Sequence, residues 1–181
     1  MPHLVGKQVL LREYQMEDLP YARLWVNDPK TTTMLSHRFL PPQSWEDTEA
    51  FFRGVVEGRN PGYHFVIAKK EDSTYLGQID LLFLQQIDRN AELGIVIGEA
   101  RHRGKGYGQE AISLLLDYAF GQCNLHRIHL AAVAENEGAI RCYEACGFAR
   151  EGLLRQHIYI NGAFRDMVQM GVLKPEWEQQ K

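Results

Sequence analysis

The chain has 181 residues and a formal net charge of −3, with 45% apolar and 24% charged residues. This composition is that of an ordinary globular protein, and we expect one domain over residues 1–181. The small net charge without a basic run argues against a nucleic-acid partner, and no apolar stretch is long enough to cross a membrane. Three cysteines without CxxC spacing, and a start that lacks a signal-peptide pattern, favour free thiols and a cytoplasmic location.

The first third of the chain predicts a strand, a helix and an irregular segment. Apolar residues at 4–14 indicate the strand, and the helix follows over about 17–27, with Pro20 in its first turn. Prolines disrupt residues 28–43, which we expect to be irregular. A second helix then begins with a capping box at Ser44 and ends near Gly58.

Three strands are predicted in the middle of the chain, over residues 63–69, 75–84 and 91–98. A polar turn at 71–73 joins the first two, which predicts an antiparallel pair. Residues 103–108 come next and read Arg-Gly-Lys-Gly-Tyr-Gly, before a segment with helical apolar spacing at 109–120. The order is therefore strand, glycine-rich turn and helix.

The glycine-rich turn predicts a phosphate site. Unpaired N–H groups and the positive end of the dipole at a helix N-terminus attract phosphate, and glycines let it approach the backbone. The spacing does not fit a dinucleotide-binding GxGxxG motif or a P-loop. A turn without any ligand is the remaining alternative, and it does not explain three alternating glycines.

The last third of the chain predicts a strand, a helix and a hairpin. The strand covers residues 126–134, and Asn136 is placed as the N-cap of a helix that stops at Gly147. Asn161-Gly162 between two extended segments predicts a β-hairpin. The whole is an α/β (α+β) fold with a mixed, mostly antiparallel sheet and about four helices. Its one parallel βαβ crossover, from 91–98 to 126–134, should be right-handed.

Several of these segments together resemble the GNAT superfamily of N-acetyltransferases. Arg103, Gly106 and Gly108 match its Arg/Gln-x-x-Gly-x-Gly/Ala acetyl-CoA loop. The run from Asn136 to Phe148 is similar to its second signature. Leu11-Arg12, Glu17-Asp18, Ala91-Glu92 and Tyr159 to Gly162 resemble the RimJ/RimL-like branch of ribosomal-protein and spermidine acetyltransferases. The resemblance covers nearly the whole chain, and it implies a GNAT-type fold and an acetyl-CoA-dependent N-acetyltransferase.

The resemblance also implies which residues hold acetyl-CoA. The backbone of the glycine-rich turn would bind the pyrophosphate, and the pantetheine arm would lie along the preceding strand. A buried core strand, an N-cap at Asn136 and a solvated helix face at Arg141 are the plain structural alternatives. The expected contacts are Ile95, Val96, Ile97, Gly98, Arg103, Gly104, Lys105, Gly106, Tyr107, Gly108, Asn136 and Arg141. We expect no metal, because no His or Cys spacing fits a metal site.

Acetyl transfer to an amine requires a proton acceptor and a donor for the leaving thiolate. By resemblance, Tyr143 is the candidate acid that protonates the thiolate, although it could be only a core aromatic residue. Glu92 lies in a mostly apolar strand, where an unused carboxylate costs desolvation. The resemblance makes it the candidate general base, directly or through water, and a structural ion pair is the alternative.

The sequence leaves the acceptor amine open among a small amine, an amino sugar and a protein N-terminus. Residues 34–45 contain no acidic residue, which weakens a polyamine acceptor such as spermidine without excluding it. A non-catalytic acyl-CoA-binding sensor or scaffold is the alternative from another class, and the presence of both Glu92 and Tyr143 argues against it. The apolar final hairpin suggests a homodimer.

Overall fold

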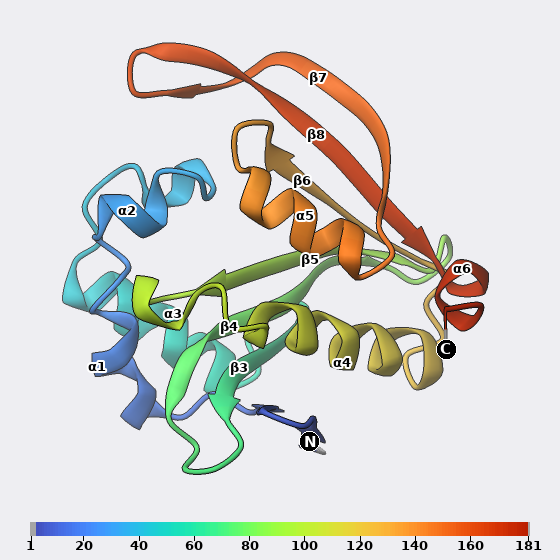
Figure 1. The fold of residues 1–181 in the computed structure, drawn as a ribbon. Helices are drawn as coiled ribbons and strands as arrows, with labels where there is room; N and C mark the ends of the chain where they lie inside the picture. Colours follow the sequence, from blue (N-terminus) through green and yellow to red (C-terminus); the bar gives the residue numbers. More distant parts are fainter. Residues whose placement is uncertain (1–2, 181) are drawn as a thin grey trace.

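The computed structural model describes residues 3–180, in which eight strands form a single sheet. The strand order is β1-β2-β3-β4-β5-β6-β8-β7, and only β5 and β6 are parallel. Figure 1 shows the long β7–β8 hairpin extending past the ends of the other strands. The strands are β1 (Leu4–Val5), β2 (Val9–Arg12), β3 (Tyr63–Lys69), β4 (Tyr75–Gln85), β5 (Asn90–Ile97), β6 (Arg127–Val133), β7 (Ala149–Ile160) and β8 (Ala163–Leu173).

The helices include three of substantial length. These are α3 (Trp45–Val56), α4 (Tyr107–Gly121) and α5 (Glu137–Ala145). Short helices and 3₁₀ turns complete the described chain: α1 (Leu19–Ala22), α2 (Pro29–Thr32), α6 (Lys174–Glu178), η1 (Met16–Asp18), η2 (His37–Phe39) and η3 (Ala100–His102). Within residues 3–180, no helix combines the length and the apolar character that crossing a bilayer requires.

The mixed sheet, the parallel crossover and the final hairpin confirm the predicted fold. Three local predictions near the N-terminus are wrong. Residues 4–14 form a small hairpin of β1 and β2, because Gly6 N–H bonds back to Val9 at 2.9 Å. The helix predicted over 17–27 ends as α1 at Ala22, where the backbone continues in turns with i→i−3 bonds. The segment 28–43 is not wholly irregular, since it contains α2 and η2.

Two apolar clusters lie on opposite faces of the sheet. The larger one packs α4, through Ile112, Leu115 and Leu116, against alternate side chains of the central strands. The smaller one packs Trp25 and Phe52 against the other face. Along β5, alternation therefore directs odd-numbered side chains toward α4 and even-numbered ones toward the α1–α3 side. Functional side chains on β5 are sorted in the same way.

The sheet opens between its two parallel strands. Pairing of β5 with β6 extends only from Asn90 to Glu92 on β5, opposite Arg127 to His129 on β6. Beyond that point β5 keeps its partner β4 to Ile97, and β6 keeps its partner β8 to Val133. The facing backbone edges of β5 and β6 thus do not pair with each other over the second half of both strands. An extended ligand can form hydrogen bonds with these unpaired edges.

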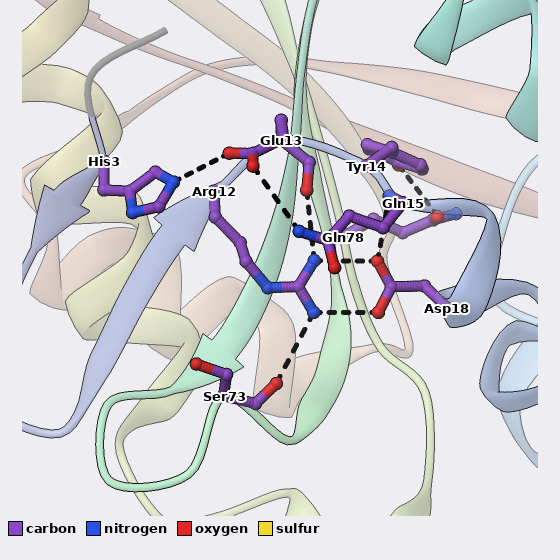
Figure 2. A network of polar contacts seen from close by, with 8 residues as sticks. All are labelled: His3, Arg12, Glu13, Tyr14, Gln15, Asp18, Ser73 and Gln78. Carbon is purple, nitrogen blue, oxygen red and sulfur yellow. Dashed lines mark hydrogen bonds and ion pairs between the residues drawn. The ribbon is translucent and has the colours of Figure 1, made fainter.

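A buried ion pair anchors the N-terminal segment that carries α1 (Figure 2). Both guanidinium nitrogens of Arg12 donate to the Asp18 carboxylate, at 2.7 and 2.8 Å, and both side chains are almost fully buried. Asp18 also accepts from the Gln15 backbone N–H at 3.1 Å. Arg12 and Asp18 therefore satisfy each other in a place where either charge alone would be costly.

We expect Asp18→Asn to lower the free energy of unfolding by about 3 kcal/mol, because it leaves a buried guanidinium uncompensated. Denaturant titration measures this change. Glu13→Gln is the matched control, since the His3–Glu13 pair nearby is half exposed and should contribute less than about 1 kcal/mol. Equal destabilisation by the two variants would contradict a special role for the buried pair.

Candidate functional site

The glycine-rich turn ends in an unsatisfied helix N-terminus. Gly104 and Gly106 adopt positive φ angles of 70° and 83°, and α4 begins at Tyr107 rather than at the predicted residue 109. The first N–H of this helix with an acceptor is that of Glu110, which bonds Gly106 at 3.0 Å. In the described chain, the N–H groups from Gly106 to Gln109 have no hydrogen-bond acceptor. They form an anion-binding end without side chains in the way.

The first turn of α4 lies directly against β5 and α5. A Cβ added at Gly108 would meet Ile95 Cδ1 and Ile97 Cγ1 at 3.9 Å and Cys142 Sγ at 4.0 Å. The helix N-terminus, the open edge of β5 and helix α5 are therefore neighbours. The structure brings the predicted phosphate turn, pantetheine strand and second signature together at one place.

The side chain of Arg103 is exposed and acts as a clamp between neighbouring segments of the chain. Its guanidinium donates to the carbonyls of Ile97 (3.1 Å), Gly98 (2.9 Å) and Lys30 (3.2 Å) and to the Thr31 hydroxyl (2.6 Å). Its backbone N–H bonds the Ala100 carbonyl at 3.1 Å. The backbone N–H and the guanidinium N–H groups of Arg103 thus have acceptors within the protein, and the side chain ties the turn to β5 and to α2.

Removal of the Arg103 side chain should weaken acetyl-CoA binding indirectly, through the order of the turn. We expect Arg103→Ala to raise the dissociation constant about tenfold, because the turn must then be ordered on binding. Calorimetry gives the constant, and hydrogen exchange of residues 98–104 should become faster. Arg101→Ala is the control, because Arg101 is exposed and its one ion pair among residues 3–180 is with Glu99. An unchanged constant in Arg103→Ala would contradict the positioning role.

Three other predicted cofactor residues have local partners or positions but no demonstrated role. Lys105 is exposed. Arg141 pairs with Glu137 on the exposed face of α5, at 3.2 Å. The Asn136 side chain accepts from the Ala139 N–H at 3.4 Å, which confirms its predicted N-cap position. Contact of these residues with a cofactor remains a prediction.

Tyr143 is half-buried on α5, with its ring 6.1 Å from that of Phe148. Burial, followed by the neighbouring thiols of Cys142 and Cys146, raises the pKa of Tyr143 to about 12. No residue of the described chain forms a hydrogen bond with its hydroxyl. A tyrosine in this state keeps its proton at neutral pH, and its hydroxyl can donate a hydrogen bond to a ligand.

Glu92 lies on β5 at the point where β5 and β6 separate. It is opposite Leu82 of β4 and His129 of β6 in the sheet register, on the face toward α1–α3. Its carboxylate makes no ion pair with any residue from 3 to 180. The alternative of a structural ion pair therefore has no support in the described structure, and the carboxylate is available to a ligand.

A second acidic group on this face was not predicted. Asp80 of β4 accepts a hydrogen bond from His64 Nδ1 at 2.8 Å, and it lies opposite Gly94 of β5. Burial raises the pKa of Asp80. Burial lowers the pKa of His64. The hydrogen bond and the charge of Asp80 raise this pKa by more than burial lowers it, so the net shift is upward. The one sequence signal was a lone charge in the apolar strand 75–84.

No metal centre is visible in the part of the chain that the structure describes. Within residues 3–180, no three His, Cys, Asp or Glu side chains gather in a way that could hold an ion. His102 lies beside the turn and is buried, with Glu99 3.7 Å away. Burial, and then the charge of Arg101, lower the pKa of His102.

Comparison with known proteins agrees with this geometry. A family model described as an acetyltransferase (GNAT) domain matches residues 8–149. Spermidine N(1)-acetyltransferase of Vibrio cholerae is 30% identical over 174 residues, which cover 96% of this chain and 97% of that protein. A putative ribosomal N-acetyltransferase, YdaF of Bacillus subtilis, is 37% identical over 61% of this chain and 60% of its own. The crystal structure of the Vibrio cholerae spermidine N-acetyltransferase with CoA and spermine superposes with a TM-score of 0.84, at 29% identity, over 96% of this chain and 99% of that one.

Proposed function

Because the chain belongs to the GNAT family of acetyltransferases, we propose that its open β5 edge and the α4 N-terminus hold acetyl-CoA beside a primary amine. The protein is an acetyl-CoA-dependent N-acetyltransferase. The observation that carries the proposed site is the row of N–H groups from Gly106 to Gln109 without acceptors, placed against β5. Acetyl-CoA is a substrate here, and its thioester carries the group that is transferred.

The proposed cofactor site has two parts. The free N–H groups of the α4 N-terminus bind the diphosphate, since the helix dipole and unpaired donors favour negative charge there. The pantetheine amides pair with the open edge of β5 over Ile95 to Gly98, where β6 has moved away. One backbone N–H of this edge also stabilises the oxygen of the attacked carbonyl.

The acceptor amine approaches from the α1–α3 side of the sheet. A primary amine with a pKa near 10.4 is mostly protonated at neutral pH, which costs about 4–5 kcal/mol of reactivity. We propose that Glu92 attracts the ammonium by its charge and that a carboxylate on this face of the sheet accepts the released proton, directly or through water. Tyr143 donates a hydrogen bond from its hydroxyl to the departing sulfur. The amine attacks the thioester directly, without an acyl-enzyme.

The relatives support a polyamine acceptor, while the local residues favour an amine with less charge. The Vibrio cholerae relative is named for spermidine. Here, however, Arg38 lies 4.5 Å above the Phe51 ring, and no acidic residue occurs between 34 and 45. A cation in this place repels a polycation unless other groups compensate it. We therefore propose a primary amine with a single ammonium near the site, with spermidine as the second candidate.

A thiol-release assay with acetyl-CoA and an amine panel tests the acceptor. The panel contains spermidine, an amino sugar and a peptide with a free N-terminus, at matched concentrations. A higher kcat/KM for the peptide or amino sugar supports our first choice, and a higher value for spermidine overturns it. Acetyl-CoA binding without turnover on any amine would favour the sensor alternative.

The domain organisation, the location and the oligomeric state of the protein belong to the same proposal. Strands from both ends of the chain join one sheet, which supports a single domain over residues 1–181. Free Cys123, Cys142 and Cys146 suit a reducing cytoplasm. The exposed Phe164 on the β7–β8 hairpin supports a homodimer, which light scattering can measure.

A further inference from the structure

We infer that Asp80, held in place by His64, takes the proton that the acceptor amine releases before it attacks the thioester. This inference rests on the proposed function, because it concerns the same acceptor site. It assigns a role to a buried pair on β3 and β4 that neither the family motifs nor the known relatives' names mention. Glu92 then keeps its charge and holds the substrate.

One oxygen of Asp80 is free and faces an open position. Oδ1 accepts from His64 Nδ1, whereas Oδ2 has no hydrogen-bond partner within the described residues. A Cβ added at Gly94 would lie 4.0 Å from Oδ2 and 3.5 Å from Leu82 Cδ1. The missing side chain of Gly94 therefore leaves room directly beside this oxygen, on the strand proposed to carry the thioester.

The register of the sheet places two carboxylates around that room. Asp80 is opposite Gly94, and Glu92 is two residues before Gly94 on the same face of β5. An amine above Gly94 can contact both. The two groups differ in their surroundings, since Glu92 has no partner among the described residues while Asp80 is bound by a histidine.

His64 makes this pair suitable for holding a proton. Its Nε2 lies 3.1 Å from the Pro61 carbonyl oxygen, which can only accept, so both ring nitrogens are needed as donors. Neutral His64 satisfies one of these bonds only. The pair therefore binds a further proton readily and titrates as a unit.

The other charged and titratable groups around the pair are few. Arg38 of η2 acts on both members and opposes protonation. Tyr14, whose ring centroid is 6.4 Å from that of His64, and Tyr75 of β4 also sense the Asp80 charge. Both tyrosines have raised pKa values and stay neutral. Asp18, which is paired with Arg12, acts on the same two tyrosines, and Glu92 is a further acid on this face.

The proton balance of the step is simple. An N–H bond of the ammonium breaks, and the proton joins Asp80 Oδ2 of the deprotonated pair. The freed nitrogen lone pair forms the C–N bond with the thioester carbon, and the C–S bond breaks. The sulfur receives the second nitrogen proton, which gives the amide and free CoA. The first proton leaves the pair to water.

The pH dependence of kcat/KM for the best amine tests this assignment. The pair acts as a base only when it lacks its extra proton, so kcat/KM should rise with pH around the pKa of the pair. This rise is the acidic limb of the pH profile. We expect Asp80→Asn to lower kcat/KM on the order of 100-fold and to abolish this limb. His64→Asn should move the limb to lower pH. The Asp80 carboxyl then titrates alone, without the histidine that takes up the extra proton of the pair. Glu92→Gln should raise KM and leave the limb in place.

Two further measurements keep the test decisive if a buried variant folds poorly. Gly94→Ala should lower kcat/KM for the amine while acetyl-CoA affinity stays unchanged, since the methyl occupies the room beside Oδ2 without a clash. NMR titration of the His64 ring with CoA bound should show a raised pKa that falls in Asp80→Asn. Loss of the limb in Glu92→Gln with its retention in Asp80→Asn would overturn the inference. Absence of turnover in the unmodified enzyme would instead reject the proposed acceptor chemistry, and the NMR result would still report on the pair.

Discussion

Gly106→Glu is expected to weaken acetyl-CoA binding about 1000-fold, which corresponds to about 4 kcal/mol. Two effects combine. Gly106 has a φ of 83°, where a side chain costs about 1–2 kcal/mol. The new carboxylate also stands at the N-terminus of α4, where it attracts the free N–H groups itself and repels the diphosphate. Calorimetry with acetyl-CoA measures the loss.

A matched glycine tests whether the loss of binding is specific to the N-terminus of α4. Gly58 also has a positive φ, 69°, and an added Cβ there would meet nothing within 4 Å. Gly58→Glu therefore carries the same backbone strain and charge at the end of α3, and it should leave the acetyl-CoA constant unchanged. At Gly106 the nearest atom to an added Cβ, Gln8 Nε2, is 3.8 Å away, so a steric clash does not explain the effect. Normal binding by a folded Gly106→Glu protein would remove α4 as the diphosphate site.

Local signals in the sequence predicted the scaffold of the site well. The Ser44 capping box, the Asn136 N-cap and the positive φ of Gly147 all occur where the residues indicated them. Asn161 and Gly162 form the predicted hairpin turn, with φ of 49° and 81°. These features depend on a few neighbouring residues, which is why one sequence sufficed. Helix α2 was missed although it has a local signal, since Asp28 caps it and Pro29 stands in its first turn, and the contact of Thr31 with Gly98 adds a distant one.

The His64–Asp80 pair shows why the acceptor side could not be predicted. Counting back from the turn bond between Lys69 and Thr74 places His64 opposite Ile79. A β-bulge between Ile67 and Ala68 shifts the register by one residue and brings Asp80 opposite His64. A one-residue shift moves a side chain to the other face of the sheet. The Arg103 clamp was likewise hidden, because its partners are carbonyls that no side-chain pattern reports.

Tyr143→Phe is expected to lower kcat by a few hundred-fold, within the range of about 10²–10³ for one lost hydrogen-bond donor to a developing negative charge. The acetyl-CoA dissociation constant should stay within about twofold, since the hydroxyl acts on the sulfur as charge develops. Tyr118→Phe is the matched control. Tyr118 is also a half-buried tyrosine whose pKa is raised to about 12, but it lies on α4 itself and packs edge-on against Phe65 of the core. A thiol-release assay gives kcat, and calorimetry gives the acetyl-CoA dissociation constant.

The raised pKa of Tyr143 also constrains how it acts. A thiolate with a pKa near 8.5 cannot fully deprotonate a phenol of pKa about 12, because transfer would cost about 5 kcal/mol. The hydroxyl therefore stabilises the departing sulfur by donating a hydrogen bond, and the proton that finally stays on sulfur comes from the amine nitrogen. The rate loss in Tyr143→Phe should then be the same at every pH where the unmodified enzyme works. An unchanged kcat in Tyr143→Phe would exclude Tyr143 from the reaction.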